Sequence, residues 1–213
     1  RLLSYLSWRR KRRLRHLRPV LDAVIADLLA SAPRHLLVTG DLTHVGLPGE
    51  CREARDWLAA LAERVPVSVV PGNHDRLVND DWAATVGQWA PWLGGATTPD
   101  AGPVGFPVVM RCGAVALIGL DSAVPTPPLL AGGRIGAEQL GRLAGHLAAL
   151  GREGLFRLVY LHHSPLPHGH AWRKRLRDAA ALLAVLRAQG AELVVHGHGH
   201  HEAQETVATR AGP

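Results

Sequence analysis

The hydrophobic and polar positions along the chain form a pattern that predicts strands separated by helices. Between short apolar runs, apolar residues recur every three to four positions, as in amphipathic helices. The short runs, typical of buried strands, occupy residues 35–38, 67–70, 157–161 and 192–195. The helical pattern covers residues 50–64, 136–150 and 172–188. Strands that alternate with helices indicate parallel βαβ units, so the chain is expected to have an α/β fold.

Three further segments complete this pattern. Pro19 suits the first position of a helix and Pro33 suits the end of one, so a helix is expected between them. Its apolar stripe consists of Val20, Leu21, Val24, Ile25, Leu28 and Leu29. A Trp-rich stretch at about residues 80–92 is also predicted to be helical. Two apolar runs on either side of residues 112–113 predict a β-hairpin, so the sheet should be mixed.

Composition favours one globular domain spanning residues 1–213. The chain is 47% hydrophobic and 20% charged, with no internal repeat and no long linker. No apolar run is long enough to cross a bilayer, and no signal-peptide pattern opens the chain. Cys51 and Cys112 lack a CxxC spacing and are expected to be buried free thiols in a reducing compartment. We therefore expect a cytoplasmic protein.

Positive charge is concentrated at the start of the sequence. Of a net charge of +6, residues 1–18 carry eight Arg or Lys and no acidic residue, interleaved with Leu, Tyr and Trp. Such a segment suits an anionic membrane surface, nucleic acid or an anionic substrate, or it forms a solvated helix face. Among these partners we expect a membrane surface, to which the protein would be peripheral, rather than nucleic acid.

Polar residues that can bind metal follow four of the predicted strands. They are Asp41 after the first strand; Asn73, His74 and Asp75 after the second; His162 and His163 after the third; and His196, His198, His200 and His201 after the fourth. In open parallel sheets, functional groups gather beyond the carboxyl ends of the strands. These side chains are therefore expected to share one site.

The residue types narrow the chemistry of that site. A His-rich tract alone is only a compositional signal, and a lone Gly-Asp or Asn-His-Asp is usually a turn. Four such signatures, each after a strand, argue for a common metal site instead. Carboxylate, amide and imidazole ligands without cysteine suit Mn, Fe, Zn or Mg and do not suit a structural Cys-rich zinc site.

The ordered series "GDLTH", "GNHD", "HHSP" and "GHGH" resembles the calcineurin-like metallophosphoesterases. The resemblance runs from about Leu36 to Glu202. The segments "LIGLDSAVP" and "GRIGAEQL", around Asp121 and Gln139, are similar to the branch that contains the class III cyclic-nucleotide phosphodiesterases. The resemblance implies a four-layer α/β/β/α sandwich of mixed sheets, with a dinuclear metal centre at the carboxyl ends of the strands.

It also implies a role for each site residue. Asp41 would bridge two divalent ions, Asn73, His162 and His198 would complete the shell of one ion, and His200 would reach the other. His163 is the rival of His162, which is preferred because it stands first after its strand. His74 would stabilise phosphoryl oxygens or protonate the leaving group, and Asp75 would hold its ring. His196 and His201 fall outside the motif and receive no role.

One family motif has no match in this sequence. The family opens with an Asp-x-His motif on its first strand, which we expect upstream of Arg1. The implied reaction is hydrolysis of a phosphodiester or phosphomonoester through two metal ions. The alternatives are a peripheral-membrane hydrolase of a lipid-linked pyrophosphate, and a catalytically weak metal-binding module attached to membrane or nucleic acid. We also expect four basic residues after Trp172 to lie near the mouth of the site; they are Arg173, Lys174, Arg175 and Arg177.

Overall fold

Two β-sheets of different size pack together in the computed structural model, which describes residues 17–94, 105–166 and 171–209. The first half of the chain contributes α2 (Arg18–Ala30), β1 (Leu36–Val38), α3 (Pro48–Ala62), β2 (Val67–Val69) and the 3₁₀ helix η2 (Val86–Trp92). The second half contributes β3 (Val108–Cys112), β4 (Val115–Gly119), α4 (Ala137–Arg152), β5 (Phe156–Leu161), the 3₁₀ helix η4 (Trp172–Lys174), α5 (Ala179–Gln189) and β6 (Leu193–His196).

The strand order confirms both parallel and antiparallel pairing. In the smaller sheet, β1 pairs with β2 in parallel. The larger sheet has the order β3-β4-β5-β6, in which the predicted hairpin β3–β4 is antiparallel and the other two pairs are parallel. The carboxyl ends of β4, β5 and β6 therefore meet at one edge of the larger sheet, as the carboxyl ends of β1 and β2 do in the smaller one.

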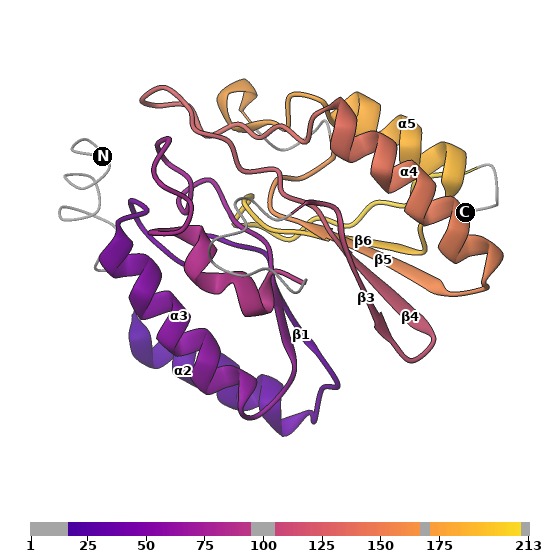
Figure 1. Ribbon diagram of the computed structural model, residues 1–213. Coiled ribbons are helices and arrows are strands. Elements are labelled where there is room, and N and C mark those ends of the chain that lie inside the picture. The colour runs from indigo at the N-terminus through magenta and orange to yellow at the C-terminus, as the bar shows by residue number, and fades with distance from the viewer. Residues whose placement is uncertain (1–16, 95–104, 167–170, 210–213) are drawn as a thin grey trace.

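The period-2 alternation along the larger sheet produces the four layers. Leu117 and Tyr160 point into a core shared with β2 and α3, while their neighbours Ile118 and Val159 point into a second core with α4 and α5. Helices α2 and α3 lie outside the smaller sheet, and α4 and α5 cover the far face of the larger one (Figure 1). The α/β/β/α sandwich expected from the sequence is confirmed.

Two predicted helices differ from the structure. The Trp-rich stretch forms turns and then the short η2, which contains Pro91, a residue that cannot donate a helical hydrogen bond. The helix predicted at residues 172–188 begins only at Ala179. The segment before it hydrogen-bonds to another loop, with the carbonyl of Arg173 accepting from the N–H of Ala131 at 2.9 Å. Tertiary hydrogen bonds therefore replace the first helical turns.

Helix α2 buries less of its apolar stripe than its sequence suggests. Ile25 and Leu29 pack against the core between α3 and the two sheets. The other four stripe residues are 40–57% exposed; they are Val20, Leu21, Val24 and Leu28. Both cysteines are free thiols as expected, but only Cys51 is buried, and Cys112 is half-buried. Among the described residues, no helix has the length and apolarity to span a bilayer.

A buried arginine ties the second half of the sandwich together. The side chain of Arg157, on β5, donates to the carbonyl oxygens of Leu147, within α4, at 3.2 Å and of Gln189, the last residue of α5, at 2.7 Å. It also forms a bidentate ion pair with Glu192, in which Nε lies 3.0 Å from Oε2 and Nη2 lies 2.5 Å from Oε1. Gly151 and Gly190 leave room for the guanidinium, since a Cβ at either would lie within 2.8 Å of it.

Replacing Arg157 by Met should lower the free energy of unfolding by about 3 kcal/mol, because two carbonyl groups and a carboxylate lose their donor. Urea denaturation followed by circular dichroism measures this change. The matched control is Arg55→Met, which removes an exposed arginine paired with Asp56 and should cost less than about 0.5 kcal/mol. Equal effects of the two substitutions would contradict the role given to Arg157.

Candidate metal centre

The predicted ligands from all four strand ends meet around the imidazole of His162, which is buried after β5. Its Nε2 lies 3.2 Å from Oδ1 of Asn73 and 3.1 Å from Nδ1 of His198. Oδ2 of Asp41 is 3.4 Å away. Atoms bound to one divalent ion at about 2.0–2.2 Å lie roughly 3–3.5 Å from one another. Asn73, His198 and Asp41 thus each place a potential ligand atom at such a distance from Nε2 of His162.

The hydrogen bonds on the far side of each ring decide which nitrogen carries the proton. Nδ1 of His162 is 2.7 Å from the carbonyl oxygen of Thr39, and Nε2 of His198 is 3.1 Å from that of Lys174. A carbonyl only accepts, so each of these nitrogens is the N–H of its ring. In the neutral rings, the nitrogens that face each other therefore carry lone pairs. Metal-binding histidines are commonly oriented by such carbonyl contacts.

A divalent cation fits this donor set. With these tautomers, Nε2 of His162 and Nδ1 of His198 offer lone pairs, and Oδ1 of Asn73 and Oδ2 of Asp41 lie close to Nε2 of His162. Protonating His162 is disfavoured, because burial lowers its pKa even though the Asp41 charge opposes that effect. The donor set of nitrogen and oxygen atoms fits a divalent ion of the Mn, Fe, Zn or Mg type.

Two of the proposed ligands have an unfavourable backbone conformation. Asp41 and His198 have φ angles of 59° and 65°, in the left-handed region that non-glycine residues rarely adopt. Such strain persists where the surroundings over-determine it, and it is concentrated at functional sites. Gly72 allows the two loops of the smaller sheet to approach, since a Cβ there would lie 2.3 Å from Oδ1 of Asp41.

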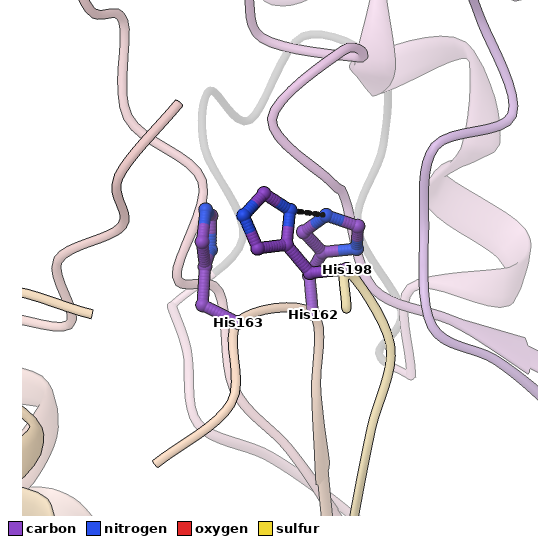
Figure 2. Close-up of side chains that lie close together, drawn as sticks. All are labelled: His162, His163 and His198. Atoms are coloured by element: carbon purple, nitrogen blue, oxygen red, sulfur yellow. Dashed lines mark hydrogen bonds between the residues drawn. The ribbon is translucent and has the colours of Figure 1, made fainter. Parts of the chain in front are cut away.

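His163 lies beside this group but has different partners. The rings of His162, His163 and His198 lie close together (Figure 2), and one nitrogen of each falls within 4.8 Å of the others. However, Nδ1 of His163 is 2.9 Å from the Ser122 hydroxyl, and its Nε2 is 3.1 Å from the Ala131 carbonyl. The Ser122 hydroxyl can donate to one ring nitrogen of His163 and the Ala131 carbonyl can accept from the other, whereas Nε2 of His162 faces the oxygen of Asn73 and Nδ1 of His198; this difference is consistent with the preference for His162 as the ligand.

His74 and Asp75 have partners that the sequence did not predict. Asp75 was expected to hold the His74 ring, but the carbonyl of His44 does so, 2.7 Å from Nδ1. The buried carboxylate of Asp75 accepts instead from the backbone N–H groups of Asp41, Gly72 and Thr43 at 2.7–2.9 Å, and from the Thr43 hydroxyl. Burial, followed by the charge of Asp41, raises the pKa of Asp75 to about 7, while these donors favour the charged form.

The other three histidines at and after the end of β6 differ in exposure and contacts. His200 is exposed, has a φ of 55°, and lies near enough for its charge to lower the pKa of His162. His196 contacts the Ser164 hydroxyl at 3.2 Å, and the exposed His201 contacts the carbonyl of Gly199 at 2.8 Å. Neither His196 nor His201 was expected to be a ligand. The family resemblance gives Asp41 and His200 to a second ion, and that assignment stays a prediction.

Several residues that support the site were missed by sequence reasoning. The carbonyl groups of Thr39, His44 and Lys174 leave no signal in a sequence, because every residue has one. Arg76 is also new: its guanidinium contacts Oδ2 of Asp121 at 2.9 Å and the ring of Trp82 at 5.4 Å. The backbone of Asp121 is in turn paired with the Gln139 side chain. The sequence signal that could have identified Arg76 was its position directly after the "GNHD" motif.

The chain is similar to proteins of one known family. The family model described as calcineurin-like phosphoesterase matches residues 13–202. A probable cyclic nucleotide phosphodiesterase from Rhodococcus erythropolis is 31% identical over 92% of the chain and 59% of the relative. A cAMP/cGMP dual specificity phosphodiesterase from Mycobacterium tuberculosis is 31% identical over 82% of the chain and 51% of the relative. The chain thus spans less than two thirds of the length of these relatives.

Replacing His162 by Ala should abolish tight metal binding, whereas His163→Gln should retain it, because His162 is a proposed ligand and the ring of His163 is hydrogen-bonded to Ser122 and Ala131 instead. Titration with Co²⁺, followed by its visible absorption, measures both affinities after removal of bound metal. Gln can preserve hydrogen bonding at position 163, so it also serves as the folding control. Loss of Co²⁺ binding in His163→Gln with normal circular dichroism would reverse the assignment.

Proposed function

Because the chain belongs to the calcineurin-like phosphoesterase family, we propose that it is a metal-dependent phosphodiesterase that uses two divalent ions. The observation that carries this proposal is the convergence of Asp41, Asn73 and His198 on Nε2 of His162. We propose a cyclic nucleotide as the substrate, since the relatives are named as cyclic nucleotide phosphodiesterases.

The first ion would be held by Asp41, Asn73, His162 and His198. Asp41 would also contact the second ion, for which His200 is the other ligand proposed in this chain. Catalytic ions usually have about three protein ligands, so the first site is expected to bind more tightly. When bound, divalent ions supply Lewis-acid polarisation of the phosphoryl group and activation of water. Mn, Fe, Zn and Mg all fit the ligand types.

His74 is the proposed acid or electrostatic catalyst. Its backbone N–H donates to Oδ1 of Asp41 at 2.9 Å, so the residue directly adjoins the proposed bridging ligand. The contact of Nδ1 with the His44 carbonyl fixes the proton on that nitrogen, which leaves Nε2 as the position that can exchange a proton with the substrate. A cationic or donating imidazole there would offset charge on the phosphoryl oxygens or protonate the leaving group.

A second substrate class is favoured by the surface beside His198. Trp172 is 74% exposed, and the four basic residues that follow it are exposed as well; they are Arg173, Lys174, Arg175 and Arg177. Since the Lys174 carbonyl contacts His198, this aromatic and basic segment adjoins the proposed metal centre. Exposed Trp beside cations suits an anionic membrane interface, which would bring a lipid-linked pyrophosphate within reach.

Activity measurements on the protein reconstituted with Mn²⁺ separate these proposals. Hydrolysis of bis(p-nitrophenyl) phosphate would support a phosphodiesterase, and a panel of cyclic nucleotides and lipid pyrophosphates would identify the substrate class. A higher kcat/KM for the cyclic nucleotides is expected. Absence of hydrolysis of every substrate, with metal bound, would contradict the enzymatic function and favour a metal-binding module.

Replacing His74 by Ala should reduce kcat by roughly 10²–10⁴-fold, the usual effect of removing a positioned acid–base group. Metal content should remain normal, because His74 is not among the proposed ligands. Steady-state kinetics and elemental analysis of the same preparation test both statements. A variant purified without metal would show that His74 is a ligand.

Reversing two charges, in Arg173→Glu with Lys174→Glu, should raise KM for an anionic substrate several-fold, because these residues lie beside the proposed centre and attract anions. The increase should shrink at high ionic strength, where the attraction is screened. Arg52→Glu with Arg55→Glu, on the exposed face of α3, controls for net charge. An unchanged KM in the first double variant would mean that the segment is an ordinary solvated surface.

A further inference from the structure

We infer that Glu50 is a positioning residue that holds the His74 imidazole in place through the loop at residues 43–47. The inference rests on the proposed function, because it concerns the residue proposed to act on the substrate. Glu50 lies in the first turn of α3, outside the motifs that identify the site. Its carboxylate reaches back along the chain to the loop that contacts His74.

Three backbone groups of the loop bind this single carboxylate. Oε1 of Glu50 accepts from the N–H of His44 at 3.3 Å, and Oε2 accepts from those of Val45 and Leu47 at 3.1 and 3.0 Å. A charged acceptor makes each of these hydrogen bonds stronger than a neutral one would. The peptide groups from residue 44 to residue 47 are therefore fixed by contacts with one side chain.

The loop in turn fixes His74 from two directions. The His44 carbonyl lies 2.7 Å from Nδ1 of the ring, and the Thr43 hydroxyl, which shares its one proton with the Asp75 carboxylate, lies 3.1 Å from the backbone carbonyl of His74. Glu50 binds the N–H of His44, while His74 binds its carbonyl. A shift of this residue would therefore move the acceptor that sets both the ring orientation and the tautomer.

Gly46 shows how closely the loop lies over the histidine. Its φ is 66°, and a Cβ at this position would lie 2.9 Å from the carbonyl oxygen of Asp75 and 3.1 Å from that of His74. The loop therefore packs directly on the backbone of these two residues, and a side chain at position 46 would push it away. Gly46→Ala is thus a second way to displace the loop without altering Glu50.

A purely local role for Glu50 predicts a different outcome. A carboxylate in the first turn of a helix stabilises that helix through its dipole and by accepting backbone N–H groups. If this were its whole contribution, its removal would lower stability but would not depend on the identity of residue 74. Coupling between the two side chains is therefore the quantity to measure.

The experiment is a double-mutant cycle on the full chain with bis(p-nitrophenyl) phosphate and Mn²⁺, using Glu50→Ala, His74→Ala and the pair. Glu50→Ala should lower kcat by roughly ten- to a hundredfold, since small misplacements of catalytic groups have effects of this size. KM and metal content should change little. In the His74→Ala background the same substitution should change kcat by less than about twofold, because the residue it positions is gone.

Matched variants distinguish the effects of the charge of Glu50, the length of its side chain and the position of the loop. Glu50→Asp keeps the charge but is one methylene shorter, so it should also lower kcat, and Glu50→Gln should retain more activity than Ala. Gly46→Ala should lower kcat in protein that retains His74, and it should have little effect on kcat in the His74→Ala variant. Glu53→Gln removes an exposed carboxylate from the same helix and should leave kcat unchanged. Equal kcat losses from Glu50→Ala in both backgrounds would overturn the inference.

A spectroscopic measurement tests the same contact independently of activity. In protein labelled with ¹⁵N-histidine, His74 should show a hydrogen-bonded Nδ1–H signal, assigned by its absence in His74→Ala. Glu50→Ala should shift this signal or abolish it, and Glu53→Gln should not. An unchanged signal in Glu50→Ala would refute the positioning role. If the wild-type protein hydrolysed no substrate, the proposed function would fail, but this signal would still decide the role of Glu50.

Discussion

The rest of the site depends on one constraint, which is that the side chains of Asp41, Asn73 and His198 converge on Nε2 of His162. Thr39 and Lys174 hold the far sides of two rings through backbone carbonyls, which turns Nε2 of His162 and Nδ1 of His198 toward each other. The strained φ angles of Asp41 and His198 are the local cost of this arrangement. A bound cation would offset it, so ion binding and the conformation of these loops are coupled.

Asp75 stabilises the loops that carry the proposed ligands. Its carboxylate joins the backbone after β1 to the backbone after β2, through N–H groups of Asp41, Thr43 and Gly72. Burial and the charge of Asp41 raise the pKa of this carboxyl, so these hydrogen bonds must offset an unfavourable environment. The "GNHD" motif thus combines a proposed ligand, a proposed catalyst and a structural carboxylate in three consecutive residues.

The sequence predicted the architecture better than the details of the site. Short apolar runs separated by helical patterns, together with the polar strand ends, were enough to place Asp41, Asn73, His162 and His198 at one edge of the sheets. The partner of the His74 ring could not be predicted, because it is a backbone carbonyl. The helix expected to begin at Trp172 failed for a similar reason: its first residues bond to the loop around Ala131, and no local pattern reveals such a contact. In the sequence, Glu50 looks like an ordinary acidic residue in the first turn of a helix. Its contacts with the loop at residues 43–47 appear only in the structure.

The position of His162 also has a consequence for how the chain folds. Its hydrogen bond to Thr39 spans 123 residues and joins a strand end of the smaller sheet to one of the larger. Each sheet can form from its own half of the chain, but the ion site requires that the two halves dock. Contacts of such long sequence separation carry a large loop-closure entropy and tend to form late. A chain with its helices formed and its sheets still apart would bind metal poorly, so metal uptake would follow the docking step rather than the formation of secondary structure.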